Sequence, residues 1–539
     1  MPTTSEATVD DAPILKSRSR QIVTPVWFSW AVPVSAGLLI LPVWLASLPA
    51  MPDFPAHLAT FYLLAGGAKD PHIAQFYRVE WAFVPNLAAE IIVPALARIM
   101  PLMAATKLFL SAVVAMWVVG PAAIHKALYG RIGAAPLAAG FFAYNANFMW
   151  GFFNYCFGTG LSFLILAAWI ASDGKRGPLH LAGFALLVTA VYFCHLFAVA
   201  TLLVMITCYE LEELWGERPL SAIKVVARGI PVAAIFFPAF LAFVFLKPHG
   251  ADSGHLEFNL LGTLDDRASA AIQFTFDRPA YLLFVGLFLF FTIGLYWKTV
   301  TVHPRMRLLL ALLAAAVLFT PEWAMGGWGV DLRLPAVLGA LAFAACEFRL
   351  KERTTEAFAA AVMLLIAYQS ATLAGNWGYY SRQFSEFRSA IGKVPPGSKL
   401  VTVLDGDAMG LASDQPYWHM AEYAIIDRGD FTPLLFTTKG QHVVQLQPAV
   451  TRIAASTAQQ GSPPDIDELD DIEAGNIHDD PDIKNVFPYL IGFQCHFDFA
   501  VVIHSGGTQS RPPDMLRRIH AGSFFSLYRI LPSDDCKGP

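Results

Sequence analysis

Residues 26–60 read VWFSWAVPVSAGLLILPVWLASLPAMPDFPAHLAT, an uncharged apolar run that passes directly into a segment with three prolines, an aspartate and a histidine. Crossing about 30 Å of hydrocarbon at about 1.5 Å per residue takes roughly 17 to 25 apolar residues. The run from Val26 to Leu48 therefore predicts a transmembrane helix. Asp53 and His57 follow its end directly, at the expected membrane surface.

The composition of the whole chain supports a polytopic membrane protein. Of its 539 residues, 55% are hydrophobic and 15% are charged, whereas about a quarter of the residues are charged in soluble domains. The mean hydropathy is +0.49. The formal net charge is only -5 and no basic segment stands out, so nucleic acid is not an expected partner.

Further spans are predicted wherever uncharged apolar runs recur, which makes about eleven in all. The run Leu179 to Tyr209 is too long for one span and contains His195, so it is divided into two helices that turn at this histidine. The other predicted spans are Leu108 to Ile124, Ala134 to Trp150, Phe152 to Ala171, Ile230 to Leu246, Tyr281 to Trp297, Leu308 to Thr320, Leu334 to Cys346 and Ala357 to Leu373.

The placement of lysine and arginine predicts the orientation. Cytoplasmic loops retain positive charge, and this rule is best satisfied if residues 1–25 form a cytoplasmic tail and residues 26–375 a transmembrane domain. An odd number of spans then places residues 376–539 on the outer side of the membrane, as a soluble domain. Membrane lipids are therefore expected partners.

The same orientation makes residues 49–107 the first periplasmic loop. Two apolar segments of this loop, Phe54 to Gly66 and Leu87 to Pro101, are too short or too charged to span the bilayer. They are predicted to be helices that lie in the membrane interface, joined by a polar turn.

The C-terminal third changes to short β-branched or aromatic runs separated by turn-rich stretches. Strands are predicted at Leu400 to Leu404, Tyr423 to Ile426, Phe499 to Ile503 and Phe525 to Ile530. This alternation predicts a small α/β or α+β domain attached to an all-α membrane domain. The acidic stretch Gly461 to Asp482 is interpreted as a solvated loop.

Two of the six cysteines, Cys495 and Cys536, lie in this C-terminal domain. An oxidising compartment would permit a disulfide between them, although the sequence alone does not establish the pairing. The other four lie in predicted spans, where they act as small apolar residues.

Asp53 has two interpretations. A helix that begins near Pro55 would place Asp53 at its N-cap, so that the carboxylate only caps the first turn and His57 only faces the headgroups. Alternatively, ionisable residues at the membrane boundary are costly unless they are used, and a carboxylate held among prolines would serve as a general base or a cation ligand. Both interpretations remain open at this stage.

The wording PDFPAHLA resembles the Asp-x-Pro-x-His-Leu-Ala signature of bacterial polytopic proteins thought to belong to the GT-C superfamily of integral membrane glycosyltransferases. The layout is similar too: an acid after the first span, two interfacial helices, many short spans and a C-terminal outer domain. The resemblance implies a GT-C-like fold, a polyprenyl-phosphate-linked sugar as donor, and an unidentified glycan, lipid or protein as acceptor. It also implies that Asp53 activates the acceptor hydroxyl.

Such a transfer also needs a cation for the departing phosphate. The best candidate is Arg333, which follows Asp331 in PEWAMGGWGVDLRLP, residues 321–335, immediately before a predicted span. A guanidinium offers a planar fork to phosphate oxygens. The alternative is that Asp331 and Arg333 form only a surface pair or contact lipid headgroups.

Further candidates to line the site are His57, His195 and Asn154, together with the neighbouring Asn145 and Asn147. Two alternatives stand beside this interpretation. His195 is equally explained as an interior histidine with satisfied hydrogen bonds, and the asparagines as partners of backbone groups that are freed between short helices.

A divalent metal ion is the one cofactor that the sequence leaves open. Metal-dependent members of the superfamily carry a second acidic motif in a later outer loop, and the corresponding turn here has no acid. The possible substitutes are Glu80, Glu90 and Glu322, or a site shared by Asp53 and His57. A metal-independent reaction fits the residues better, so no metal ligand is assigned.

Two other functions remain open. A transporter or flippase of a lipid-linked or small polar substrate would carry ionisable groups near the centres of its spans, whereas here such groups collect at one face. A non-catalytic envelope assembly component is also compatible with the chain, because the C-terminal third shows no recognisable catalytic motif.

Overall fold

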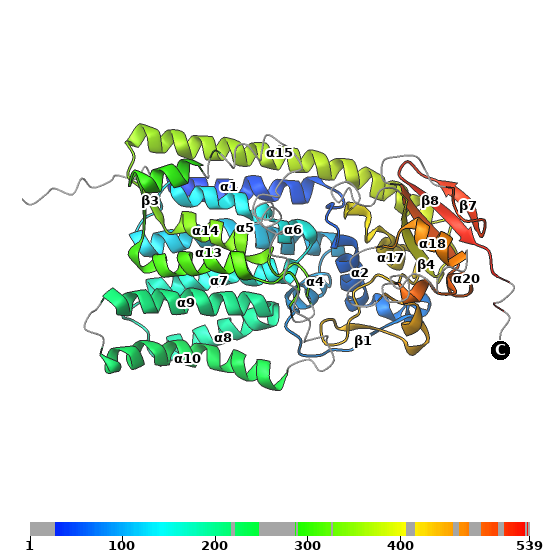
Figure 1. The fold of residues 1–539 in the computed structure, drawn as a ribbon, viewed down its shortest axis with the longest axis horizontal. Coiled ribbons are helices and arrows are strands. Elements are labelled where there is room, and N and C mark those ends of the chain that lie inside the picture. Colours follow the sequence, from blue (N-terminus) through cyan, green and yellow to red (C-terminus); the bar gives the residue numbers. More distant parts are fainter. Residues whose placement is uncertain are drawn as a thin grey trace, which may run out of the picture.

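The computed structural model describes residues 27–216, 221–246, 286, 289–324, 327–405, 415–455, 463–473, 487–504, 511–533 and 536. The molecule is elongated, with a helical bundle at one end and a small sheet at the other (Figure 1). The predicted N-terminal tail, residues 1–25, lies outside the described residues. So do residues 281–285, 287 and 288 of the predicted span Tyr281 to Trp297.

The bundle consists of apolar helices packed side by side (Figure 1). Five described helices are long and apolar enough to cross a membrane, by length and composition. These are α1 (Trp27–Leu45), α5 (Leu102–Tyr129), α7 (Phe153–Ala171), α10 (Ala222–Phe245) and α15 (Glu352–Ile391). The other helices of the bundle are α8 (Pro178–Cys194), α9 (Leu196–Gly216), α13 (Arg307–Phe319) and α14 (Arg333–Ala344).

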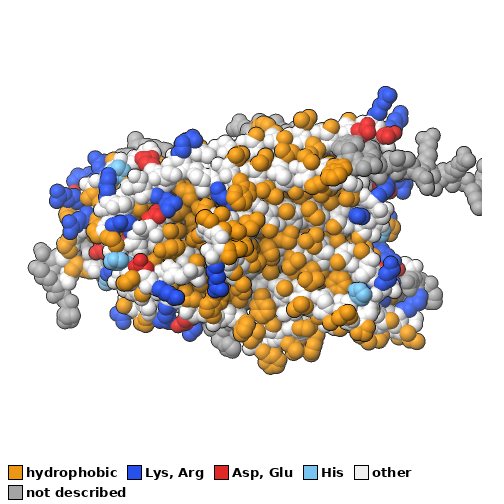
Figure 2. All heavy atoms as spheres, turned by 180° about the vertical axis from the view of Figure 1, so that it is seen from behind, with side chains coloured by type: hydrophobic (Ala, Val, Ile, Leu, Met, Phe, Trp, Pro, Cys, Tyr) orange, Lys and Arg blue, Asp and Glu red, His pale blue; other side chains and the backbone are white. Residues whose placement is uncertain are grey.

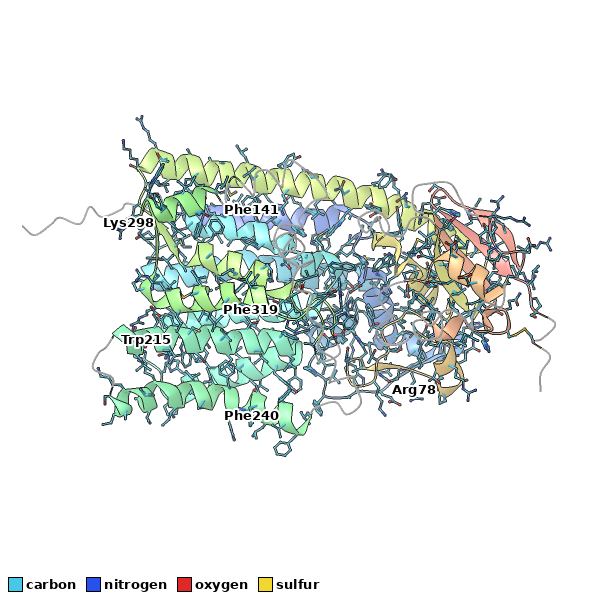
Figure 3. The ribbon with its side chains drawn as sticks, viewed as in Figure 1. Arg78, Phe141, Trp215, Phe240, Lys298 and Phe319 are labelled. Carbon is cyan, nitrogen blue, oxygen red and sulfur yellow. A yellow bond between two sulfur atoms is a disulfide. The ribbon has the colours of Figure 1, made fainter. Side chains whose placement is uncertain are left out.

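Hydrophobic side chains cover a broad band of the surface over the bundle, and Lys and Arg side chains gather beyond both ends of this band (Figure 2). Phe240 on α10 and Phe319 on α13, both labelled in Figure 3, are 59% and 68% exposed. A soluble protein rarely exposes so large an apolar patch. The surface therefore supports a membrane protein, while the predicted number of spans is not confirmed.

Ion pairs tie the helices together at the bundle end that lies away from the sheet, where Figure 3 labels Lys298. Glu210 on α9 lies 2.8 Å from both Arg176 and Arg228, and Arg305 lies 2.9 Å from Asp173. Arginines from three separate segments therefore meet acids at this end of the bundle. The paired charges explain how acids and bases share one end of an apolar bundle.

His195 lies at the predicted turn, because α8 ends at Cys194 and α9 begins at Leu196. The predicted span Ala134 to Trp150 is wrong. A buried 3-10 segment, η2 (Ala135–Tyr144), leads instead into the short helix α6 (Ala146–Trp150). The side chain of Asn145 caps α6 by accepting the N–H groups of Asn147 and Phe148, and this cap begins a new helix inside the apolar run.

The first outer loop contains both predicted helices, as α2 (Phe54–Leu64) and α4 (Ala88–Leu96). The predicted interfacial position is wrong for α2, because all but two of its residues are buried. It packs against α4 and against two C-terminal segments, η5 (Met420–Glu422) and α17 (Tyr423–Arg428). The apolar surface that suggested a membrane interface is covered by protein.

A two-stranded sheet joins this loop to the C-terminal region. Strand β1 (Tyr77–Val79), which follows the short helix α3 (Pro71–Ala74), pairs antiparallel with β5 (Val444–Leu446). The Tyr77 hydroxyl donates to the carbonyl of Thr432 at 3.2 Å and accepts its N–H at 3.0 Å. Residues far apart in the sequence thus form one packed unit at this end of the molecule.

The main sheet has the strand order β4 (Leu400–Asp405), β6 (Phe499–His504), β8 (Phe525–Ile530), β7 (Leu516–Ala521). Strands β4 and β6 are parallel, and the other pairs are antiparallel. Three predicted strands are confirmed, and β7, an edge strand with two arginines, was not predicted. Part of the predicted acidic loop is helical, as α18 (Ile466–Glu473).

The predicted strand Tyr423 to Ile426 is wrong, because it forms α17. A short apolar run cannot be assigned to a strand or to a buried helix from its pattern alone. Gly429, with a φ of +70°, closes the C-terminus of this helix. The predicted domain boundary at residue 376 also falls inside an element, since α15 has 40 residues and runs from the bundle into the sheet end (Figure 1).

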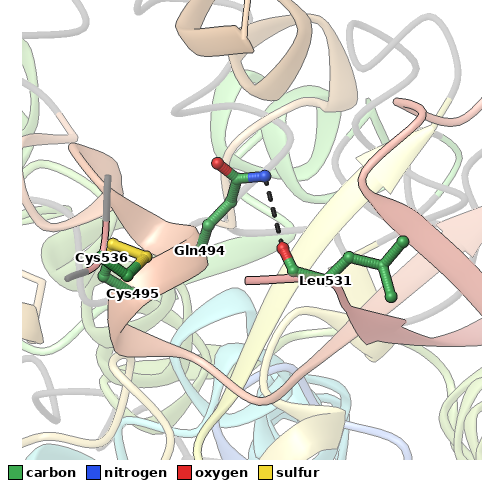
Figure 4. The surroundings of a disulfide bond; sticks show 4 residues. All are labelled: Gln494, Cys495, Leu531 and Cys536. Atoms are coloured by element: carbon green, nitrogen blue, oxygen red, sulfur yellow. Dashed lines mark hydrogen bonds between the residues drawn. A yellow bond between two sulfur atoms is a disulfide. The ribbon is translucent and has the colours of Figure 1, made fainter. Parts of the chain in front are cut away.

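Cys495 and Cys536 form a disulfide across a sequence separation of 41 residues. It ties Cys536, which lies beyond the end of β8 at Ile530, to α20 (Phe493–His496), and beside it the Gln494 side chain donates to the carbonyl of Leu531 at 3.4 Å (Figure 4). The structure thus contains the disulfide that the sequence permitted but did not establish.

Replacing Cys495 with Ser should lower the free energy of unfolding of the C-terminal region by roughly 2–4 kcal/mol, since the cross-link restricts the unfolded chain. Thermal unfolding and limited proteolysis of the purified protein measure the effect. Reductant should bring the wild type to the stability of the variant and leave the variant unchanged. Insensitivity of the wild type to reductant would contradict the prediction.

Candidate functional site

Asp53 lies between α1 and α2, where the bundle meets the C-terminal region. Its side chain is buried, with 7% of the residue exposed, and its N–H donates to the carbonyl of Trp150 at 3.0 Å. Asp53 occupies the N-cap position of α2, yet its side chain makes no capping hydrogen bond. The capping interpretation therefore does not account for this carboxylate.

Two buried residues of the C-terminal region, His419 and Glu422, face Asp53. Nε2 of His419 lies 3.8 Å from Oδ1 of Asp53, and Nδ1 lies 3.4 Å from Oε1 of Glu422. The imidazole thus stands between two carboxylates. Sequence analysis missed both residues, because nothing in their local sequence connects them with a loop more than three hundred residues earlier.

Burial raises the pKa of Asp53 from 3.8 to about 7, although His419 lowers it and Glu422 raises it further. Burial also opposes the charged form of His419, but Glu422 and Asp53 outweigh this effect and raise the pKa of the imidazole above its usual value. Asp53 therefore changes its charge near neutral pH, which suits a group that takes a proton.

Three histidines surround the ring of Phe436. The rings of His419, His57 and His442 lie 4.8, 5.5 and 5.6 Å from it. Burial lowers the pKa of His57 to about 3 and that of His442 to about 4, so both rings are neutral. The ring of His57 also packs 4.9 Å from Phe153. The predicted site residue His57 therefore lines the apolar wall beside Asp53.

The segment Trp150–Tyr155, which we call the α6–α7 junction, connects the separate candidates. Its Gly151 has a φ of +117°, and a Cβ built there would lie 2.6 Å from the Cβ of Asp53. The side chain of Asn154 donates to Glu90 at 2.8 Å and accepts the N–H of Ala89 at 2.7 Å. Gly151 and Asn154, both in the α6–α7 junction, thus position residues of the first outer loop.

Arg333, the first residue of α14, is held by the same junction. Its Cζ lies 5.7 Å from the ring of Phe152, 5.6 Å from that of Tyr155 and 4.7 Å from that of Phe197. Its Nη2 donates to the carbonyl of Trp328 at 3.2 Å, while its Nε has no hydrogen-bond partner among the described residues. A buried guanidinium enclosed by aromatic rings retains a free donor for an anion.

Asp331 is buried two residues before Arg333 and interacts with its charge. Neither residue is on the surface, so the surface-pair interpretation does not hold. His195 lies near them, with its ring 5.4 Å from that of Tyr155 and its Nδ1 accepting the N–H of Phe197 at 3.1 Å. The structure thus brings His195, Asp331 and Arg333 together and brings Asp53 and His57 together, and the α6–α7 junction contacts both groups.

The asparagines and glutamates have local partners. Asn145 caps α6, Asn147 donates to the carbonyl of Leu332, and Asn154 bonds backbone groups of the first loop, as the alternative interpretation expected. Glu80 pairs with Arg78, and Glu322 accepts the indole N–H of Trp328. Glu90 is buried, and its burial raises its pKa to about 7.

No group of three or more His, Cys, Asp and Glu side chains is arranged to hold a metal ion within the described parts of the chain. Asp53 and His57 are not arranged to share a metal ion as a pair, because the ring of His57 packs against neighbouring aromatic rings.

A second polar chain occurs in the main sheet. His504 Nδ1 lies 2.8 Å from Oδ2 of Asp405, and its Nε2 lies 2.8 Å from Oγ of Ser526. The three residues come from β4, β6 and β8, and they have the acid, histidine and hydroxyl arrangement of a nucleophilic triad. Ser526 is only 2% exposed within the sheet, so the chain ties three strand ends together and presents no accessible nucleophile.

Comparison of the chain with protein-family models and with curated proteins finds no match. The geometry of the residues themselves therefore carries the functional argument.

Replacing Gly151 with Ala should displace Asp53, because the new methyl group would overlap its Cβ. Gly66→Ala is a matched control, since Gly66 has a similar φ, +124°, but nothing lies within 4 Å of its Cβ position. The control should cost about 1–2 kcal/mol for the backbone conformation alone, and Gly151→Ala more. Thermal unfolding of the two variants tests the difference. Equal losses would show that the junction does not fix Asp53.

Proposed function

We propose that the protein is a GT-C-like glycosyltransferase of the bacterial inner membrane, which transfers a sugar from a polyprenyl phosphate to an acceptor at the periplasmic face. The observation that carries the proposal is the buried carboxylate of Asp53, which caps no helix and has a pKa of about 7. General-base catalysis near neutral pH is most efficient when the pKa of the base lies close to that pH, and the pKa of this carboxyl group does.

In the proposed reaction, the carboxylate of Asp53 takes the proton of the acceptor hydroxyl. The acceptor oxygen forms a bond to the anomeric carbon while the bond from this carbon to the phosphate oxygen breaks. The polyprenyl phosphate leaves with the electron pair of that bond. The positive charge of Arg333 stabilises the negative charge that develops on the leaving phosphate.

Three features of the site support this assignment of roles. Asp53 and Arg333 are anchored to the same short junction, through Gly151 and Phe152 respectively. The guanidinium has an unused Nε donor among the described residues. The walls beside Asp53 are aromatic, which excludes water and strengthens electrostatic interactions within the site. Asp331 and His195 are proposed to position Arg333, and His57 and Asn154 to shape the pocket.

The decisive experiment is an assay of sugar release with the purified protein and a panel of polyprenyl-phosphate sugars, with and without a chelator. Asp53→Asn should reduce turnover by about 10²–10⁴-fold, the usual contribution of a general base. Asp70→Asn is the control, because Asp70 only caps α3 in the same loop. Inactivity of the intact protein across the whole panel would favour the transporter alternative. Loss of activity with chelator would assign a metal ion to the site.

Arg333→Lys keeps the positive charge but removes the planar fork, so turnover should fall while the protein remains folded. Arg388→Lys is the matched control, since Arg388 pairs with Asp427 away from the junction. Steady-state kinetics on both variants separate the roles. Equal activity of Arg333→Lys and the wild type would remove Arg333 from the reaction.

Asp53→Asn should also change how stability depends on pH. The pKa of Asp53 is higher in the folded protein than in the unfolded chain. As pH rises from about 4 to about 7, the unfolded chain loses this proton while the folded protein keeps it, so the stability of the folded state falls over that range. The variant lacks this destabilisation, and its melting temperature should rise relative to the wild type over that range. A constant difference between the two proteins would show that Asp53 is not buried in an uncharged form.

A further inference from the structure

The charges around Asp53 come from two parts of the chain. On its own side, the nearest titratable group is His57, which burial keeps neutral. The C-terminal region contributes His419 and Glu422, both completely buried, and the neutral His442. Three charged groups on the other elements packed against α2 have partners of their own: Glu90 with Asn154, Asp427 with Arg388, and Lys107 with the carbonyl of Ala46. Lys69, on the 3-10 segment η1 (Gly67–Lys69) that also packs against α2, is exposed to solvent.

His419 is thus the basic side chain that faces Asp53 among the described residues, and it carries a positive charge when it is protonated. At 3.8 Å from Nε2 to Oδ1, the two side chains are too far apart for a hydrogen bond but close enough for a strong interaction between charges. Glu422 lies on the opposite side of the ring, and Thr432 lies 3.5 Å from Oε1 of Glu422. His419 belongs to a segment that leads directly into η5, and its imidazole lies between the two acids.

We infer that the C-terminal region sets the protonation state of Asp53 through His419, which Glu422 maintains as an imidazolium beside it. His419 takes no proton from the acceptor, because its Nε2 faces Asp53 and its Nδ1 faces Glu422. It is a positioning residue that favours the ionised carboxylate. Without it, burial alone would leave Asp53 protonated at neutral pH. Docking of the C-terminal region on α2 is thus a condition for a charged Asp53.

The catalytic consequence of this inference rests on the proposed function, but the protonation of Asp53 does not. It is measured directly by infrared titration of the full-length protein in detergent. The C=O stretch of a protonated carboxyl that disappears in Asp53→Asn reports on this residue alone. In the wild type, its intensity should fall through a midpoint near pH 7.

His419→Gln removes the positive charge, so the midpoint of the Asp53 band should move up by about one pH unit or more. His419→Asn is a second variant whose side chain is smaller than imidazole, in case the longer amide does not fit. His442→Gln is the matched control, because it removes a neutral buried ring from the same aromatic cluster, and it should leave the midpoint unchanged.

The outcomes separate the inference from the proposed function. A shifted midpoint in a protein that transfers no sugar supports the inference and removes the glycosyltransferase. In an active protein, the acidic limb of the pH profile of kcat should move up with the Asp53 midpoint in His419→Gln. Unchanged midpoints in both folded His419 variants, or an equal shift in His442→Gln, would overturn the inference.

Discussion

The hydrogen bond from the N–H of Asp53 to the carbonyl of Trp150 fixes the start of the first outer loop against the α6–α7 junction. The rest of the site depends on this contact. The junction carries Gly151 against Asp53, Phe152 against Arg333 and Asn154 against the first loop. Because these residues follow one another in the sequence, the positions of an acid and a distant guanidinium are set by the backbone of a single turn.

Burying a carboxylate is unfavourable unless opposite charge or hydrogen bonds compensate. At Asp53 the compensation is incomplete, since one imidazole faces it across 3.8 Å and a second acid stands behind that imidazole. Purely structural ion pairs elsewhere in the chain are much closer, as between Arg176 and Glu210 at 2.8 Å. The difference marks Asp53 as a group whose charge is free to change.

Many helices of the bundle were predicted from the lengths of the apolar runs. The turn at His195 was predicted from one polar residue in a run too long for a single helix. Errors arose where local pattern competes with tertiary contacts. The break at Asn145 is a side-chain cap inside an apolar run, and α2 is short and apolar enough to resemble an interfacial helix although protein covers it. Tyr423 to Ile426 is too short to distinguish a strand from a buried helix.

The candidate site was only half predictable for the same reason. Asp53 and Arg333 stand out because charge is rare beside apolar runs. His419 and Glu422 occur in an ordinary mixed segment, and only the packing of η5 on α2 brings them to Asp53. Partners of this kind can be identified only from the fold, which here joins the two regions through the pairing of β1 with β5.

The unbroken helix α15 has a mechanical consequence. Forty residues extend about 60 Å, roughly twice the thickness of a hydrocarbon layer. One part of this rod belongs to the bundle and the other carries the sheet, so any tilt of the first part swings the second. Because α15 continues without a break from one part into the other, its direction within the bundle also sets the direction in which the sheet end begins.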